Sequence, residues 1–267
     1  MGTILDRILA TKRSEVARAK VERPWASVLA EARHMPPPRD FVGALQAKIA
    51  SGAPAVIAEI KRASPSAGEF RKSGQAEFDP AAFARSYERH GAACLSVLTD
   101  REYFRGSLDD MVIARAACAL PVLRKDFIVD AYQIAEARAA GADAVLFIMG
   151  TAETAQFLEW EALARELGLA VLAESHTRED LEQALQLTTP LIGINNRDLG
   201  TFSTDVNRTL ELQARVPDGR MLITESGIDT PDIARRMQRH GVRAFLVGGA
   251  FMSQADPGQA LQRHFAL

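Results

Sequence analysis

The sequence predicts an α/β protein with one structural domain, a (β/α)8 TIM barrel that carries an extra N-terminal helical extension. Three observations lead to this fold. From about residue 55 onward, short runs rich in β-branched residues alternate with longer segments rich in Ala, Glu, Arg and Leu. Eight such units follow one another, the number that closes a barrel of this type. The runs are apolar at both odd and even positions, as expected for parallel strands covered by helices.

The eight expected strands share a short apolar core bounded by polar residues or glycine. They are Ala55–Ile60, Cys94–Leu98, Val122–Lys125, Ala144–Ile148, Ala170–Glu174, Leu191–Asn195, Met221–Glu225 and Ala244–Gly248. Four strands follow a glycine that is expected to end the preceding helix in the left-handed conformation, namely Gly91, Gly141, Gly168 and Gly241. A doubly wound open sheet is the alternative, but no G-x-G-x-x-G motif follows the first strand.

Residues 1–50 lack the alternation of short β-branched runs and longer helical segments. They are expected to form a helical extension packed on the barrel, whereas residues 51–267 form the barrel itself. Leu5, Ile8, Leu9 and Val16 lie at helical spacing among charged residues, which indicates an amphipathic helix. The prolines at 36–38 predict a stiff connector, followed by a short helix that leads into the first strand. The N-terminal helix either braces the barrel, the commoner role of an apolar helix face, or contributes to substrate binding.

The composition excludes several classes of protein. Among 267 residues, 32 basic and 34 acidic side chains leave a net charge of -2, so nothing favours a nucleic acid or an anionic membrane surface as a partner. The longest apolar run, Ala144–Met149, is too short to span a membrane, and the N-terminus lacks the apolar core of a secretory signal. Cys94 and Cys118 lie in apolar stretches and are expected to be buried, inert thiols, which fits a cytoplasmic location.

Polar residues stand at the ends of several expected strands, where barrels of this class carry their catalytic groups. Side chains alternate along a strand, so Glu59 and Lys61 share a face, and Lys125, Glu174 and Asn195 lie on the corresponding face of their own strands. One such residue alone would be read as a solvated loop side chain. Their coincidence predicts a charged barrel mouth suited to general acid and base catalysis.

Glycines lie at the ends of the seventh and eighth expected strands. Ser226 and Gly227 follow the seventh, and Gly248 and Gly249 follow the eighth, where this architecture often binds phosphate through backbone N–H groups. A phosphorylated small molecule is therefore the expected substrate. The five histidines are scattered, with no H-x-x-x-H or C-x-x-C motif, so no metal site is expected.

Together these segments resemble the indole-3-glycerol-phosphate synthase family of tryptophan biosynthesis. The resemblance runs from about Ile4 to the C-terminus and includes the N-terminal helix typical of that family. It is carried by seven segments, of which the first and sixth are the most specific: Val56–Ser66, Leu95–Asp100, Tyr103–Ser107, Val122–Phe127, Leu172–Glu174, Ile192–Leu199 and Thr224–Ile228.

The resemblance implies conversion of 1-(2-carboxyphenylamino)-1-deoxyribulose 5-phosphate into indole-3-glycerol phosphate, with loss of carbon dioxide and water and with no cofactor. It implies that Lys125 is the general acid and Glu174 the general base. Lys61 matches the second catalytic lysine, which pairs with the anthranilate carboxylate, and Glu59 orients it. Asn195 holds the closing intermediate. Which lysine donates a proton at each step stays open.

The resemblance also implies a set of substrate-binding residues. Phe104, Phe127 and Leu146 are candidates to enclose the aromatic ring, although ordinary barrel packing explains them equally well. Gly249 departs from the family, which often has serine or glutamate there. The complete set of expected binding residues is Ser64, Phe104, Phe127, Leu146, Arg197, Glu225, Ser226, Gly227, Gly248 and Gly249.

Two other functions fit the barrel. One is a Schiff-base aldolase that acts on a sugar phosphate through Lys125 or Lys61, because a lysine with a lowered pKa can attack a carbonyl. The other is a catalytically silent barrel that only binds a partner, although a scaffold has no need of charges at its mouth. The sequence also leaves open the oligomeric state, for which a monomer is the simplest expectation, and whether the loop with Arg71 and Lys72 closes over substrate. The rate-limiting step and any contact with neighbouring pathway enzymes stay open as well.

Overall fold

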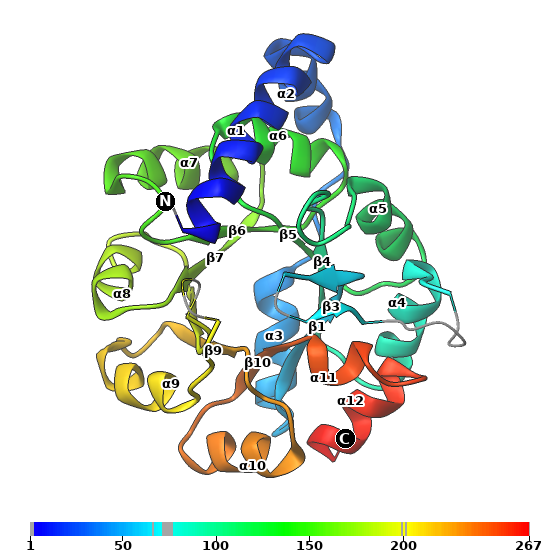
Figure 1. Ribbon diagram of the computed structural model, residues 1–267, viewed down its shortest axis with the longest axis vertical. Coiled ribbons are helices and arrows are strands. Elements are labelled where there is room, and N and C mark those ends of the chain that lie inside the picture. Colours follow the sequence, from blue (N-terminus) through cyan, green and yellow to red (C-terminus); the bar gives the residue numbers. More distant parts are fainter. Residues whose placement is uncertain (1–2, 66, 71–76, 199, 201, 267) are drawn as a thin grey trace.

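Eight parallel strands close into a barrel (Figure 1). The computed structural model describes residues 3–65, 67–70, 77–198, 200 and 202–266. Around the barrel the strands are β1 (Ala55–Ile60), β4 (Cys94–Leu98), β5 (Val122–Lys125), β6 (Ala144–Ile148), β7 (Ala170–Ser175), β8 (Leu191–Asn195), β9 (Met221–Glu225) and β10 (Ala244–Val247). All eight predicted strands are present. Pairing of β1 with β10 closes the sheet, which confirms the barrel and excludes the open sheet.

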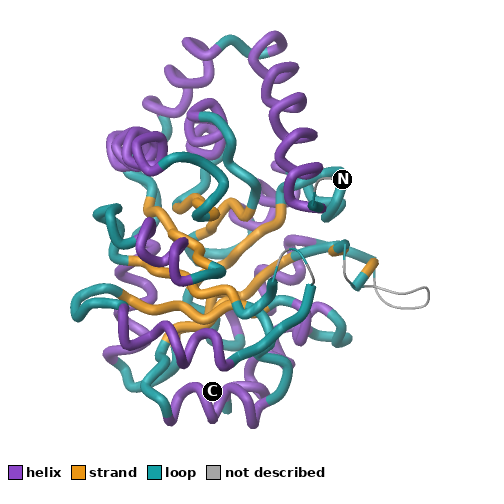
Figure 2. The backbone as a smooth tube through the Cα atoms, turned by 60° about the vertical axis from the view of Figure 1, so that its left-hand side comes forward, coloured by secondary structure: helices purple, strands orange, loops and turns teal. Residues whose placement is uncertain are grey.

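Helices surround the barrel and cover its outer face (Figures 1 and 2). They are α4 (Pro80–Arg89), α5 (Leu108–Ala116), α6 (Ala131–Ala139), α7 (Thr154–Glu166), α8 (Arg178–Ala184), α9 (Asn207–Leu212) with a 3-10 turn (Gln213–Arg215), α10 (Pro231–Arg239), α11 (Gly249–Met252) and α12 (Pro257–Phe265). Gly91, Gly141, Gly168 and Gly241 have φ between 75° and 92°, which confirms the predicted left-handed helix ends.

Alternate residues of each strand separate into two apolar layers. Val56 and Ala58 belong to the layer between strands and helices, whereas Ile57, Leu123 and Leu172 belong to the layer inside the barrel. This division confirms the predicted alternation. Consequently, the polar residues that continue the inner positions at the strand ends are directed into the mouth of the barrel.

Three helices precede the barrel: α1 (Ile4–Glu22), α2 (Trp25–His34) and α3 (Phe41–Ala50). The predicted N-terminal helix is present as α1 and the predicted short helix before the first strand as α3. Helix α2 was not predicted; it begins directly after Pro24, which ends the first helical segment. Helices α1 and α2 project as a hairpin beyond the strands (Figure 2). Ile8 and Leu9 of α1 join the layer inside the barrel together with Phe41 and Leu45 of α3, whereas Val16 of α1 belongs to the layer between strands and helices. A division of the chain near residue 50 stays a prediction.

The loop after β1 contains a small hairpin that was not predicted, in which β2 (Ala63–Ser64) pairs with β3 (Gly68–Glu69). Arg71 and Lys72 lie outside the described residues, as do Ser66 and Leu199 of the family-like segments. Cys94 is a buried free thiol, but Cys118 is only half-buried because it lies at the exposed end of α5. Among the described residues, no helix has the length and apolar character needed to cross a bilayer.

Candidate active site

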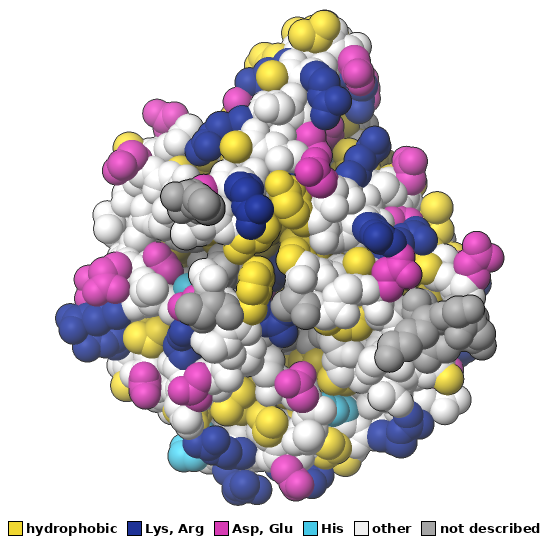
Figure 3. Space-filling model, viewed as in Figure 1, with side chains coloured by type: hydrophobic (Ala, Val, Ile, Leu, Met, Phe, Trp, Pro, Cys, Tyr) yellow, Lys and Arg dark blue, Asp and Glu magenta, His cyan; other side chains and the backbone are white. Residues whose placement is uncertain are grey.

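The carboxyl ends of the strands enclose a cavity of about 350 Å³. Figure 3 shows its mouth as a hollow near the middle of the face, with hydrophobic side chains along its rim. All of the site residues expected from the sequence line this cavity. They are Glu59, Lys61, Ser64, Phe104, Lys125, Phe127, Leu146, Glu174, Asn195, Arg197, Glu225, Ser226, Gly227, Gly248 and Gly249. A volume of this size suits a small organic substrate.

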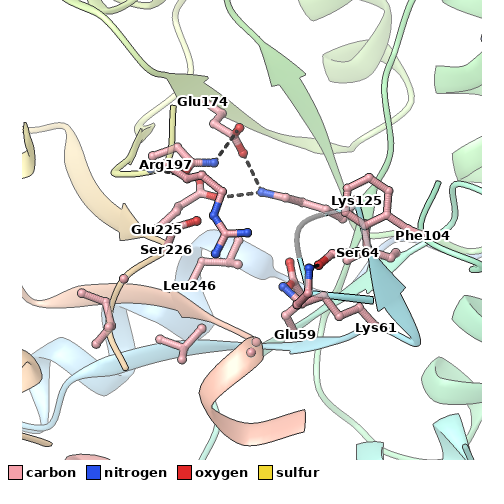
Figure 4. A pocket seen from close by; sticks show the side chains of 18 of the residues that line it. Glu59, Lys61, Ser64, Phe104, Lys125, Glu174, Arg197, Glu225, Ser226 and Leu246 are labelled. Carbon is pink, nitrogen blue, oxygen red and sulfur yellow. Dashed lines mark hydrogen bonds and ion pairs between the residues drawn. The ribbon is translucent and has the colours of Figure 1, made fainter. Parts of the chain in front are cut away.

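Lys125 at the end of β5 reaches across the barrel to two glutamates (Figure 4). Its Nζ lies 2.6 Å from Oε2 of Glu174 at the end of β7 and 2.6 Å from Oε2 of Glu225 at the end of β9. The two carboxylates are almost completely buried. Two buried acids therefore share one ammonium group, an arrangement in which their protonation states depend on each other.

The three groups shift one another's pKa in different directions. Burial by itself lowers the pKa of Lys125, but the charges of Glu174 and Glu225 outweigh it and raise that pKa well above its ordinary value. Burial raises the pKa of Glu174, but Lys125 and His176 reverse this and lower it to about 2. Burial and the charge of Glu174 raise the pKa of Glu225 to about 8. At neutral pH, Lys125 is thus a charged proton donor, Glu174 a carboxylate and Glu225 an acid that holds a proton.

Lys61 follows β1 on the other side of the cavity. Its Nζ lies 2.5 Å from Oε1 of Glu59 and 5.1 Å from the centre of the Phe70 ring. Glu59 itself is buried, and a Cβ atom at Gly248 would lie 2.2 Å from its Oε1. A glycine at 248 therefore leaves the space in which Glu59 holds Lys61, a close approach that any larger residue would prevent.

Asn195 and His176 also contact Glu174. Nδ2 of Asn195 donates to Oε1 of Glu174 at 3.1 Å, and Nε2 of His176 lies 3.3 Å from the same oxygen. Oδ1 of Asn195 accepts from the backbone N–H of Arg197 at 3.0 Å, so the Asn195 amide is oriented by the loop that follows it. The Arg197 side chain points into the cavity (Figure 4).

Aromatic and aliphatic side chains form the apolar part of the cavity wall. The rings of Phe104 and Phe127 are tilted by 40° with their centres 6.0 Å apart, and Leu146 projects from the inner face of β6. An apolar wall beside the Lys125 cluster gives the cavity one face for a ring and another for charge.

The glycine-rich end of the cavity has an unusual backbone. Ser226 has a φ of 62° and Gly227 a φ of 75°, and Nδ2 of Asn196 donates to the carbonyl of Ser226 at 3.0 Å. A non-glycine residue with positive φ is strained, and such strain clusters at functional sites. Across the cavity end, Gly249 begins the short helix α11 directly after β10.

Two residues next to the charged groups of this site, His176 and Phe70, were not among the predicted site residues. His176 stands at the polar end of the fifth expected strand, and its place two residues after Glu174 was a signal for a neighbouring role. Phe70 lies near Lys61 through the β2–β3 hairpin, for which no turn motif was recognised. Among the described residues, no group of three or more His, Cys, Asp or Glu side chains is arranged to hold a metal ion.

Comparison with known proteins gives the site its context. Residues 5–264 match the family model described as indole-3-glycerol phosphate synthase. Proteins of that name from Dechloromonas aromatica and Polaromonas sp. are 58% and 55% identical to this chain, each match covering 100% of both chains. The tryptophan synthase alpha chain from Legionella pneumophila shares the fold, with a TM-score of 0.60 at 15% identity over 85% of this chain and 93% of its own. The chain therefore belongs to the indole-3-glycerol phosphate synthase family.

Proposed function

We propose that this protein converts 1-(2-carboxyphenylamino)-1-deoxyribulose 5-phosphate into indole-3-glycerol phosphate, with release of carbon dioxide and water. One observation carries the proposal beyond family membership. A charged lysine shared by two buried glutamates faces a second lysine–glutamate pair across a cavity with an apolar wall. Such a cavity suits a substrate that bears an aromatic ring, a carboxylate and a carbonyl to be protonated.

Lys125 is the proposed general acid. Ring closure places negative charge on the substrate carbonyl oxygen as the ring carbon attacks, and the Lys125 ammonium donates a proton to that oxygen. The negative charge that Glu174 and Glu225 carry beside it keeps it protonated until the substrate arrives. Asn195 holds the intermediate through its amide, and loss of carbon dioxide then restores the aromatic ring.

Lys61 and Glu174 complete the proposed chemistry. Lys61 pairs with the substrate carboxylate before decarboxylation, and Glu59 keeps its ammonium group directed into the cavity. Glu174 accepts a proton from the intermediate, and the Lys61 ammonium protonates the hydroxyl group, which leaves as water. Lys125 and His176 lower the pKa of Glu174, so it carries no proton of its own when the intermediate forms. The same carboxylates that favour an acid at Lys125 argue against the Schiff-base alternative, which needs a lysine of lowered pKa.

The direct test is formation of the indole product by the purified protein. The carboxyphenylamino substrate is added, and the indole is followed by ultraviolet absorbance or fluorescence. Product formation that is lost in Lys125→Met supports the proposal. A rate no higher than that of this variant would contradict it, and trapping of a substrate adduct on either lysine by borohydride would favour the aldolase.

The substrate phosphate is proposed to bind at Ser226, Gly227, Gly248 and Gly249. Inorganic phosphate is therefore expected to raise the apparent KM and leave kcat unchanged, because it occupies the same place as the substrate phosphate. Initial rates over a range of substrate concentrations at several phosphate concentrations check this. Inhibition that lowers kcat without changing KM would mean that phosphate binds elsewhere.

Gly193 leaves room for the Glu225 carboxylate, and its replacement offers a further test. A Cβ atom there would lie 2.5 Å from Oε1 of Glu225. We expect Gly193→Ala to push that carboxylate away from Lys125 and to lower kcat about 10- to 100-fold, since small displacements of catalytic groups have effects of this size. Steady-state kinetics together with a thermal unfolding curve measure this. Wild-type kcat in a folded variant would rule out the steric argument.

A further inference from the structure

The N-terminal helix α1 brings a buried lysine to the ends of strands β4 and β5. Lys12 is 3% exposed, and its Nζ lies 2.7 Å from Glu15, 3.0 Å from Asp100 and 2.9 Å from Asp126. Glu15 belongs to α1, whereas Asp100 and Asp126 follow the neighbouring strands β4 and β5. One ammonium group therefore ties the added helix to two strand ends. Burial lowers the pKa of Lys12, but Asp126 and Asp100 outweigh this and raise it, so the group is charged.

The two aspartates differ in their other partners. Oδ2 of Asp126 also accepts from Thr99 at 2.6 Å and from Arg124 at 3.1 Å. For Asp100, Lys12 is the single basic partner among the described residues, and its Oδ2 is buried without another hydrogen bond there. Because a buried carboxylate is strongly destabilised when its counter-charge is removed, Asp100 depends on Lys12 more than Asp126 does.

Asp100 in turn holds the turn formed by residues 100–106, here called the Phe104 turn. Its Oδ1 accepts from the backbone N–H groups of Tyr103 at 2.8 Å and Phe104 at 3.2 Å. The tyrosine hydroxyl forms a second link to α1 through Oγ1 of Thr11 at 3.0 Å. The chain of contacts thus leads from Lys12 through Asp100 to the ring of Phe104, which lines the cavity beside Phe127.

We propose that Lys12 is a positioning residue that holds the Phe104 turn, and with it the Phe104 ring, where the aromatic ring of the substrate binds. The proposal rests on the function proposed above and assigns the N-terminal helix a part in substrate binding. Lys12 touches no substrate; it acts through Asp100. Its removal therefore weakens substrate binding more than it slows the chemical steps at Lys125, whose strand end keeps the Thr99 and Arg124 contacts of Asp126.

The test compares Lys12→Met with Lys12→Arg, which keeps the charge, and with Lys20→Met as a matched control. Lys20 lies on the same helix and pairs with Asp130 at 2.7 Å, but both side chains are partly exposed. We expect Lys12→Met to raise KM about tenfold with a smaller change in kcat, Lys12→Arg to restore most of the wild-type KM, and Lys20→Met to match the wild type.

Hydrogen exchange gives a readout that does not depend on the reaction. The amides of Tyr103 and Phe104 are expected to exchange faster in Lys12→Met than in the wild type or in Lys20→Met, because Asp100 no longer holds them firmly. If the wild type forms no indole but these amides respond, the proposed function fails and the structural link stands. If the wild type is active and Lys12→Met has a wild-type KM, the positioning role fails alone.

A double variant separates an effect on substrate binding from a loss of folding. Lys12→Met combined with Asp100→Asn removes the unpaired charge but leaves an amide oxygen to accept from the two backbone N–H groups. It also lacks the ionic link to α1, so we expect a raised KM in a variant that is more thermostable than Lys12→Met. A wild-type KM in the double variant, an effect of Lys12→Met confined to kcat, or an equal effect of Lys20→Met would each overturn the proposal.

Discussion

Replacing Lys125 by methionine is expected to lower kcat by about 10²–10⁴-fold, the range by which general acid catalysis accelerates reactions. Methionine preserves the length of the side chain but has no proton to donate. It also leaves Glu174 and Glu225 without the ammonium group that lies 2.6 Å from each. Single-turnover kinetics of indole formation measure the effect on the chemical steps separately from product release.

The control for this experiment is Lys20→Met, which removes a partly exposed lysine from α1. It is expected to keep wild-type kcat and KM. Thermal unfolding of both variants separates an unfolded Lys125→Met protein from a folded, inactive one. A folded Lys125→Met enzyme with more than about a tenth of the wild-type kcat would exclude Lys125 as the principal proton donor.

Replacing Glu174 by glutamine is expected to lower kcat by a similar factor, about 10²–10⁴-fold, because the amide cannot accept the proton released during dehydration. Glutamine keeps the shape of the side chain and can still contact Asn195. Removal of the Glu174 charge also removes one of the causes that raise the pKa of Glu225. Glu225 then ionises more readily and keeps Lys125 protonated, so the loss of rate reports on the base rather than on the acid.

Glu182→Gln is the matched control, since Glu182 forms an exposed pair with Arg178 on α8 and contributes little to stability there. It should retain wild-type kinetics. If Glu174→Gln accumulates a ring-closed intermediate that has lost carbon dioxide but retains its hydroxyl group, the assignment of Glu174 to dehydration is supported. Full activity of Glu174→Gln would remove it from the mechanism.

Local patterns in the sequence were sufficient for most of the fold. The eight strands were predicted because each one is a short apolar run that follows a helix, and the helix ends were predicted from four glycines. The break at Pro24 and the β2–β3 hairpin were not predicted. Neither changes the barrel, because the break at Pro24 lies before β1 and the hairpin lies in the loop between β1 and α4.

The candidate site residues could also be predicted from the sequence. Catalytic groups of this barrel stand at strand ends, and the alternation of side chains along a strand selects those that face inward. These two rules, together with the family resemblance, led to fifteen of the residues that line the cavity. Both rules depend only on the position of a residue along its strand and not on distances between residues of different strands.

Only the tertiary structure decided which of these groups act on each other. Lys125 is 49 residues from Glu174 and 100 residues from Glu225, and barrel closure brings the three within hydrogen-bonding distance. Their pKa values depend on burial and on these distances, neither of which a strand pattern contains. The partners of Lys12 were likewise decided by the tertiary structure. In the sequence Lys12 is one of several polar residues of an amphipathic helix, and only the fold brings Asp100 and Asp126 to it from the ends of two separate strands. The sequence by itself thus determined the fold and the residues at the mouth of the barrel, whereas three-dimensional proximity decided their charges and partners.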